Sequence, residues 1–506
     1  MEAIGEALAR DMRSKGIDIG LTLSILEDFN SGLYDGIGAV KAARVPEVDG
    51  RRVISMKDGP SLDVPKAGAR ALLDSLGLGL PPELSESAGN LRFDTKALAA
   101  LGERLLPFAA WGVLNGGSAT SYADRKKNLA YGEEVFALLE PGFESLEHLC
   151  RDHPKGLAPA YLNPDGSPGA SFLLLKVRAR LVALRSHLAR QGSPGRPFLP
   201  LFQMSSSGND AVLAEAYAEM AGDPLIAPLA SSLGAEGSDP TRFATGIQPM
   251  IAAFTHSSEG RPRRVFDRAW GRPDSALALP GGHGQSFRIL ADVLRKLRAS
   301  GTRWAWLGNV DNLGFLPDPV KLALLALTGE PAGFEFSFRT PLDVKGGILV
   351  ETAEGARTVA DIGPAIAFDE LRRLEEAGAS ILFNCATGLF DLDWLVPRLD
   401  DIARRLPVRV SDQDKDSGRY SQAEQVTWEV ASLLPSFLSY AVEKNDRFLA
   451  AKLLVETLLT SGLGRGDPRL PPELAQAALG LHAGLEAKLA GAYGLALRQG
   501  RWSDPG

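Results

Sequence analysis

From Phe108 onward, the chain alternates short apolar runs that end in glycine or asparagine with longer stretches whose apolar residues recur every three or four positions. The apolar runs occupy residues 108–117, 198–204, 303–314, 346–351 and 379–388, and helical spacing appears at 171–191, 209–222 and 285–300. Buried strands that alternate with helices predict a mostly parallel sheet covered on both faces. The fold class expected from this pattern is α/β.

The residues on either side of this region show helical spacing. Before it, the helical stretches are 2–14, 66–77 and 94–106; after about residue 421, they are 423–443, 448–462 and 473–499. A chain of 506 residues is too long for one hydrophobic core. We therefore expect a helical N-terminal segment over 1–105, an α/β core over 106–440 and a helical C-terminal segment over 441–506.

Composition excludes several classes of protein. The 62 acidic and 55 basic residues give a net charge of −7, so no general positive field is available for a nucleic acid or an anionic membrane. Two cysteines, Cys150 and Cys385, cannot build a disulfide framework, which favours a reducing compartment and hence the cytoplasm. The N-terminus carries charges throughout, and no uninterrupted apolar run is long enough to span a bilayer.

Two glycine-rich segments follow strand-like runs, where α/β proteins bind ligands. The loop LNGGSATSYADRKK (114–127) has a Gly116–Gly117 pair followed by Lys126 and Lys127, although it lacks the Walker triplet and the third glycine of a dinucleotide fingerprint. An ordinary glycine turn is an equal alternative. PGGHG (280–284) precedes a helix and can direct His283 into a cleft, although a lone histidine is more often structural.

Three further segments carry polar residues at strand ends. In GNVDNLG (308–314), Asp311 can hold a magnesium ion that bridges phosphates. The alternative is that the Asp-Asn pair at this position only forms a turn. The segment 335–351 is a predicted strand that carries Glu335 and Lys345. The alternative interpretation is an edge strand whose polar residues face solvent. FNCATG (383–388) leaves Asn384 to bind a hydroxyl-rich ligand or to cap a strand. Singly, none of these segments decides the function.

Their order is informative, because the same segments recur in the same order in the UTP–glucose-1-phosphate uridylyltransferase family, the eukaryotic-type UDP-sugar pyrophosphorylases. LNGGSATS resembles that family's uridine and phosphate loop, LPLFQMSS (199–206) its next strand end, and PGGHG its second glycine loop. GNVDNLG resembles the metal-site strand, while EFSFRTPLDVKGG (335–347) and FNCATG resemble the two sugar-site segments. SQAEQ (421–425) and DRFLAAK (446–452) extend the resemblance, which covers roughly residues 105–460.

The resemblance implies a nucleotidyltransferase, Rossmann-like core that forms a UDP-sugar and pyrophosphate from UTP and a sugar 1-phosphate, with glucose 1-phosphate as the expected sugar and Mg²⁺ as the cofactor. It implies that Asp311 binds the metal and that His283, Lys452 and either Lys126 or Lys127 lie near the phosphates. The substrate-binding residues that it implies are Gly116, Gly117, Met204, His256, Gly282, Asn309, Glu335, Lys345 and Asn384.

The chain also departs from the family pattern. The family has a glycine where this chain has Ala119 and a proline before its lysine where this chain has Lys126. His256 aligns with a glutamine that usually reads the uracil, and FNCATG lacks two asparagine-type positions. The helical last fifty residues contain no counterpart of the family's C-terminal β-helix, so the resemblance implies no oligomeric state. The alternatives are a UDP-N-acetylhexosamine or broad UDP-sugar pyrophosphorylase, and a nucleotide-sugar-binding regulator without catalysis.

Overall fold

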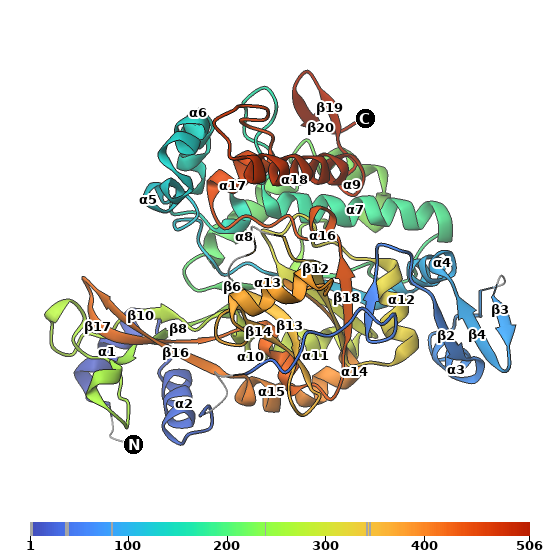
Figure 1. The fold of residues 1–506 in the computed structure, drawn as a ribbon. Coiled ribbons are helices and arrows are strands. Elements are labelled where there is room, and N and C mark those ends of the chain that lie inside the picture. Colours follow the sequence, from blue (N-terminus) through green and yellow to red (C-terminus); the bar gives the residue numbers. More distant parts are fainter. Residues whose placement is uncertain (1–3, 36–39, 82–83, 238, 341–342, 344–345) are drawn as a thin grey trace.

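The computed structural model describes residues 4–35, 40–81, 84–237, 239–340, 343 and 346–506. Its central feature is a sheet of ten strands within this part of the chain (Figure 1). Eight strands follow the spatial order β1 (Val53–Ser55), β18 (Leu438–Val442), β12 (Ala332–Phe338), β15 (Leu382–Asp391), β11 (Trp304–Asn309), β5 (Ala109–Leu114), β6 (Leu201–Ser206) and β7 (Phe243–Gln248). The hairpin of β13 (Gly347–Glu351) and β14 (Arg357–Asp361) joins beside β15.

The sheet is mixed and mostly parallel, as the sequence predicts. Strands β11, β5, β6 and β7 run parallel to one another, as do β12, β18 and β1. Strand β15 lies between these two groups and is antiparallel to both of its neighbours. Because β15 reverses the direction, both parallel groups present their carboxyl ends at the same edge of the sheet.

Helices cover both faces of the sheet, so its strands are apolar on both sides. In β5, Trp111 and Val113 pack into one core, and Ala110 and Leu114 pack into the other. The first core receives α3 (Lys66–Ser75), α4 (Thr95–Leu105), α6 (Glu133–Cys150), α7 (Phe172–Gln191), α8 (Asp210–Met220), α9 (Ala227–Ser232), α12 (Pro319–Thr328), α17 (Leu454–Thr460) and α18 (Pro472–Ala490). The second core receives α10 (Ser286–Ile289), α11 (Ala291–Ala299), α14 (Leu392–Leu395) and α15 (Leu399–Arg405).

The N-terminal residues contribute to several parts of the molecule. Helices α1 (Glu6–Ser14) and α2 (Ile19–Asn30) belong to a lobe with β8 (Met250–Ala252), β9 (Phe254–Thr255), β10 (Ala278–Pro280), β16 (Val408–Lys415) and β17 (Gly418–Gln425), which projects at the left of Figure 1. At the right, β2 (Leu62–Pro65), β3 (Ser85–Ser87) and β4 (Asn90–Phe93) form a small sheet beside α3. The segment 1–105 thus contains the expected helices and four strands in addition.

One expected helix is wrong. Residues 423–443 form the end of β17, the 3₁₀ segment η9 (Thr427–Leu433) and strand β18. All five residues of β18 are buried, since the strand lies inside the sheet between β1 and β12. A short, mostly apolar segment such as LSYAV fits a buried strand and a buried helix equally well, so spacing alone cannot separate the two.

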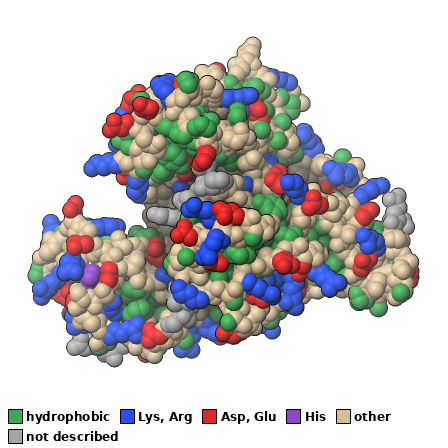
Figure 2. All heavy atoms as spheres, in the orientation of Figure 1, with side chains coloured by type: hydrophobic (Ala, Val, Ile, Leu, Met, Phe, Trp, Pro, Cys, Tyr) green, Lys and Arg blue, Asp and Glu red, His purple; other side chains and the backbone are tan. Residues whose placement is uncertain are grey.

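The C-terminal residues contain helices α16 (Lys444–Arg447), α17 and α18, joined by turns and loops. They end in a hairpin of β19 (Ala496–Arg498) and β20 (Arg501–Ser503). Among the described helices, none is long and apolar enough to cross a bilayer. Figure 2 shows acidic and basic side chains interspersed over the visible face.

Candidate functional site

The loops of the site follow strands that end side by side. Leu114 of β5 pairs with Asn309 of β11 and with Met204 of β6, and Ser206 of β6 pairs with Gln248 of β7. Residues 115–117, Gln248 and residues 310–314 therefore lie along one edge of the sheet. This is the carboxyl edge, where parallel α/β sheets bind ligands.

Gln248 joins the two glycine loops at this edge. Its Nε2 donates to the carbonyl of Gly282 at 2.8 Å and to Oε1 of Gln285 at 2.9 Å. A Cβ at Gly116 would lie 3.3 Å from Oε1 of Gln248, and a Cβ at Gly282 would lie 2.4 Å from the carbonyl of Gln425. Gly282 also has a φ of +79°, so neither space nor backbone conformation admits a side chain there.

A lysine that the sequence analysis did not select lies beside Asp311. Lys155 Nζ forms an ion pair with the Asp311 carboxylate and donates to the carbonyl of Ala451 at 2.8 Å. Its charge lies 5.2 Å from the centre of the Tyr122 ring, and its backbone N–H donates to the carbonyl of Gly117 at 3.0 Å. Lys155 therefore connects the glycine loop, the Asp311 loop and the segment that leads to Lys452.

A sequence signal for this lysine was present. The family pattern places a proline directly before its loop lysine, and Pro154 precedes Lys155. Helix α6 lies between the glycine loop and Lys155, so the lysine follows the loop at a much greater separation than the family spacing suggests. Lys126 and Lys127, which the family spacing predicts, lie closer to the glycine loop in the sequence than Lys155 does.

Lys126 and Lys127 lie on the short helix α5 (Arg125–Asn128), and both side chains are exposed. Lys127 Nζ donates to Ser121 Oγ at 3.0 Å. Within the described residues, neither lysine contacts Asp311, which pairs with Lys155.

The segment that carries Lys452 is held against the Asp311 loop. Asn312 is buried; its Nδ2 donates to the carbonyl of Arg447 at 3.0 Å, and its Oδ1 accepts from the backbone N–H of Leu449 at 3.0 Å. The backbone N–H of Lys452 donates to Glu456 at 2.5 Å, while its side chain is exposed. The main chain around Lys452 is thus fixed, whereas its ammonium group faces solvent.

Glu335, which we expected to contact sugar hydroxyls, is 2% exposed and has cationic partners. Its Oε1 accepts from Lys321 Nζ at 2.9 Å and from Arg447 Nη2 at 2.6 Å, and its Oε2 accepts from Arg447 Nε at 3.0 Å. Burial raises the pKa of Glu335, but the charges of Arg447 and Lys321 outweigh it and hold this pKa below its usual value. In this structure Glu335 anchors Arg447, at the start of the segment that carries Lys452.

His283 lies in the second glycine loop and is half-buried. Its Nδ1 lies 2.8 Å from Thr427 Oγ1 and accepts from the Thr427 backbone N–H at 3.1 Å. Burial lowers the pKa of His283 to about 4, against the opposing effect of the Asp311 charge. The imidazole is therefore neutral at physiological pH.

The other candidate residues are spread more widely. Asn309 is the last residue of β11 and is half-buried. Asn384 belongs to β15 and pairs with Phe336 of β12, and its Oδ1 accepts from the Ala386 backbone N–H at 3.0 Å. Met204 is buried in the second core. Lys345 lies outside the described residues.

His256 lies in the projecting lobe, beyond β9, where its Nδ1 is 2.9 Å from Ser258 Oγ and its Nε2 is 3.7 Å from Asp412. The structure therefore brings Gln248, and not His256, to the two glycine loops. Gln248 ends a strand of the central sheet, which is the position that the alignment of the 251–258 segment overlooked.

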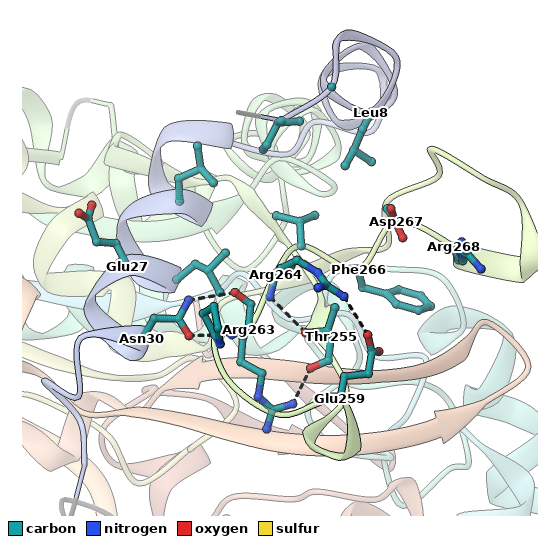
Figure 3. Close-up of a pocket in the computed structure, with 16 residues that line it drawn as sticks. Leu8, Glu27, Asn30, Thr255, Glu259, Arg263, Arg264, Phe266, Asp267 and Arg268 are labelled. Atoms are coloured by element: carbon teal, nitrogen blue, oxygen red, sulfur yellow. Dashed lines mark hydrogen bonds and ion pairs between the residues drawn. The ribbon is translucent and has the colours of Figure 1, made fainter. Parts of the chain in front are cut away.

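A cavity of about 1070 Å³ lies away from this edge, between α1, α2 and residues 255–268 (Figure 3). Leu8 and Leu26 form part of its apolar wall, whereas Arg264 pairs with Glu259 at 3.2 Å. None of the candidate residues lines it.

The carboxyl edge suits a magnesium ion that is shared with a substrate. The described residues contain no cluster of three or more histidine, cysteine or acidic side chains that could hold a metal by themselves. Asp311 supplies a single carboxylate at the end of β11. Mg²⁺ is typically held by one or two carboxylates together with substrate phosphates and water, so this donor set fits.

Comparisons with known proteins agree with the fold and the motifs. Residues 267–462 match the sequence model of UTP–glucose-1-phosphate uridylyltransferase. UDP-glucose pyrophosphorylase of Leishmania major is structurally similar, with a TM-score of 0.55 and 16% identity over 91% of this chain and 79% of that chain. The UDP-glucose phosphorylase of Trypanosoma brucei has a TM-score of 0.55 and 16% identity, over 92% of this chain and 80% of that chain. A putative UDP-N-acetylglucosamine pyrophosphorylase of Entamoeba histolytica has a TM-score of 0.50 and 16% identity, over 70% of this chain and 79% of that chain.

No significant match was found among curated proteins. The structural likeness, at these identities, concerns the fold. The chain therefore shares the fold of these UDP-sugar pyrophosphorylases. The sequence model of the UTP–glucose-1-phosphate uridylyltransferase family matches residues 267–462 and so agrees with the resemblance of the motifs in this part of the chain.

Proposed function

We propose that the protein transfers a uridylyl group from UTP to a sugar 1-phosphate, with glucose 1-phosphate as the favoured sugar. The observation that carries this proposal is the pairing of Lys155 with Asp311 at the carboxyl edge of the sheet, beside the glycine loop. A structure of a mutant UDP-glucose pyrophosphorylase from Leishmania major contains UDP-glucose, which supports the choice of sugar.

In the proposed reaction, a phosphate oxygen of the sugar 1-phosphate attacks the α-phosphorus of UTP in line. A bond forms between these two atoms, the bond from the α-phosphorus to the bridging oxygen breaks, and pyrophosphate leaves with that electron pair. No covalent enzyme intermediate is needed. Catalysis of this kind depends mainly on positioning and on stabilising negative charge.

The residues at the carboxyl edge divide this work. Lys155 and Lys452 bring positive charge to the phosphates, and His283 donates a hydrogen bond to them. Asp311 would hold Mg²⁺, which neutralises phosphate charge when it is bound. Because Lys155 contacts both the Asp311 loop and the carbonyl of Ala451, movement of this lysine toward a phosphate would affect both segments.

Gln248 is the residue that we propose for reading the base. Its Nε2 already donates to Gly282 and Gln285, which fixes the orientation of the amide. Its Oε1 faces Gly116, and a Cβ at that glycine would lie 3.3 Å from this oxygen. An amide oxygen accepts hydrogen bonds, and the uracil ring offers an N–H donor.

A panel of substrates tests the proposal. Each of the four nucleoside triphosphates is combined with Mg²⁺ and with glucose, galactose or N-acetylhexosamine 1-phosphate, and pyrophosphate release is measured. We expect the highest rate with UTP and glucose 1-phosphate. A preference for an N-acetylhexosamine would correct the sugar, and no release with any pair would overturn the proposal.

A matched pair of variants places the reaction at this edge. Lys452→Ala should lower turnover by about 10²–10³, by analogy with the loss of one well-placed charge donor. Lys415→Ala, at the exposed end of β16, should leave turnover unchanged. Saturable binding of UDP-glucose without exchange of labelled pyrophosphate into UTP would instead indicate a regulator.

A further inference from the structure

The hydrogen bonds of His283 determine which nitrogen of its ring carries the proton. The backbone N–H of Thr427 lies 3.1 Å from Nδ1, and a backbone N–H can only donate. Nδ1 is therefore an acceptor. A neutral imidazole that accepts at Nδ1 carries its hydrogen on Nε2. Within the described part of the chain, no hydrogen bond occupies Nε2, so this N–H is available to a ligand.

Thr427 also fixes the backbone of the histidine. Its hydroxyl lies 2.7 Å from the carbonyl of His283 and 2.8 Å from Nδ1, so one side chain contacts both the main chain and the ring. The residues just before it close the other side of the loop, because a Cβ at Gly284 would lie 2.5 Å from the carbonyl carbon of Gln425. The Trp428 ring centre is 6.3 Å from the imidazole centre.

We infer that Thr427 is a positioning residue that holds His283 as a neutral imidazole whose Nε2–H donates to a phosphate oxygen of the bound nucleotide. This inference rests on the proposed function and deepens it. It gives His283 the role of a fixed hydrogen-bond donor, distinct from the cationic role of the lysines. No proton has to leave or reach the imidazole during turnover.

The charges around the ring are consistent with this role. Strand β17, segment η9 and helix α10 pack against the loop, and η9 brings Thr427 and Trp428 to the ring. Among the described residues, Asp311 is the group whose charge acts on His283, and it opposes the effect of burial. The imidazole is thus neutral above about pH 5.

The first test measures the tautomer in the free protein, without substrate. Nitrogen-15 NMR of histidine-labelled protein distinguishes a protonated Nε2 from a protonated Nδ1, and the signal is assigned by its loss in His283→Gln. We expect the Nε2–H form at pH 7 in the wild type and in Thr427→Val, which both keep the backbone N–H that donates to Nδ1, and a mixture of tautomers in Thr427→Pro, which lacks it. An Nδ1–H form or an imidazolium in the wild type would refute the inference.

The second test uses amides that replace one ring nitrogen each. The side-chain N–H₂ of glutamine reaches the position of Nε2, whereas that of asparagine reaches the position of Nδ1. His283→Gln should retain turnover within about tenfold, and His283→Asn should lose about 10², the usual effect of deleting one donor. Equal turnover of the two variants would contradict the inference. If the wild type shows no transferase activity, the proposed function fails, while the NMR result still decides the tautomer.

Discussion

The replacement Lys155→Met tests the part of the site that the structure revealed. Methionine keeps most of the length of lysine and removes the charge. The ammonium group of Lys155 donates hydrogen bonds to the Asp311 carboxylate and to the carbonyl of Ala451, and its charge faces the Tyr122 ring. We expect the turnover number to fall by about 10²–10³, which corresponds to about 3–4 kcal/mol of lost transition-state stabilisation.

The same replacement should have a small effect on folding. The side chains of Lys155 and Asp311 are 18% and 13% exposed, so solvent partly screens their ion pair. The expected loss is about 1 kcal/mol of unfolding free energy, which lowers the melting temperature by roughly 2 °C in a chain of this size. The loss of turnover is thus much larger than any loss of folded protein at the assay temperature.

Initial rates of pyrophosphate release with UTP, Mg²⁺ and the preferred sugar 1-phosphate measure the first effect, and thermal unfolding measures the second. Lys127→Met is the matched control, because Lys127 is an exposed lysine of the same region whose side chain, among the described residues, donates to Ser121 alone. If Lys127→Met loses turnover and Lys155→Met retains it within threefold, the reasoning from the ion pair is refuted.

Four other replacements probe the packing and the electrostatics of the site. Arg447→Met leaves the buried Glu335 carboxylate short of a partner and should lower the unfolding free energy by about 3–5 kcal/mol in urea titrations; a loss below 1 kcal/mol would contradict this. Gln248→Ala should raise KM for UTP and weaken discrimination among the four bases, whereas His256→Ala should do neither; the reverse pattern would restore His256 as the base reader. Burial raises the pKa of Asp318, but its lysine and arginine neighbours outweigh burial and set this pKa at about 2. Because the folded pKa of Asp318 is below its unfolded value, this carboxylate contributes about 2 kcal/mol of unfolding free energy above pH 4, which is lost as the pH falls from about 4 to 2. Asp318→Asn should therefore reduce the change of the urea midpoint with pH over that range. An unchanged pH dependence would contradict the ion pair of Asp318 with Lys321.

The sequence predicted the fold class because strands buried on both faces leave a clear pattern of apolar runs. The runs that contain Trp111 and Trp306 end in the loops that the structure brings to one edge. Strand β18 was mistaken for a helix, since all five of its residues are buried, Ser439 included, and no alternation of buried and exposed positions reveals a period of two. Pairing partners, and not local spacing, determine the conformation there.

The candidate site was predictable where a motif is contiguous, as at His283 and Asp311. It was not predictable at Lys155, because helix α6 places this lysine far from its loop in sequence while folding keeps the two in contact. Glu335 shows the opposite limit. Its motif is recognisable, but its partners Lys321 and Arg447 come from other elements, and only the structure shows that they engage both of its carboxylate oxygens.

The contact between Lys155 and Ala451 joins residues that are 296 positions apart in the chain. Contacts of such high sequence separation are expensive to close and form late when a protein folds. During synthesis, the glycine loop and the Asp311 loop emerge long before the segment of Lys452 that completes this edge of the sheet. A chain that has been synthesised only as far as Asp311 therefore carries the two glycine loops and the carboxylate without Lys452. The proposed reaction requires synthesis to continue beyond that lysine.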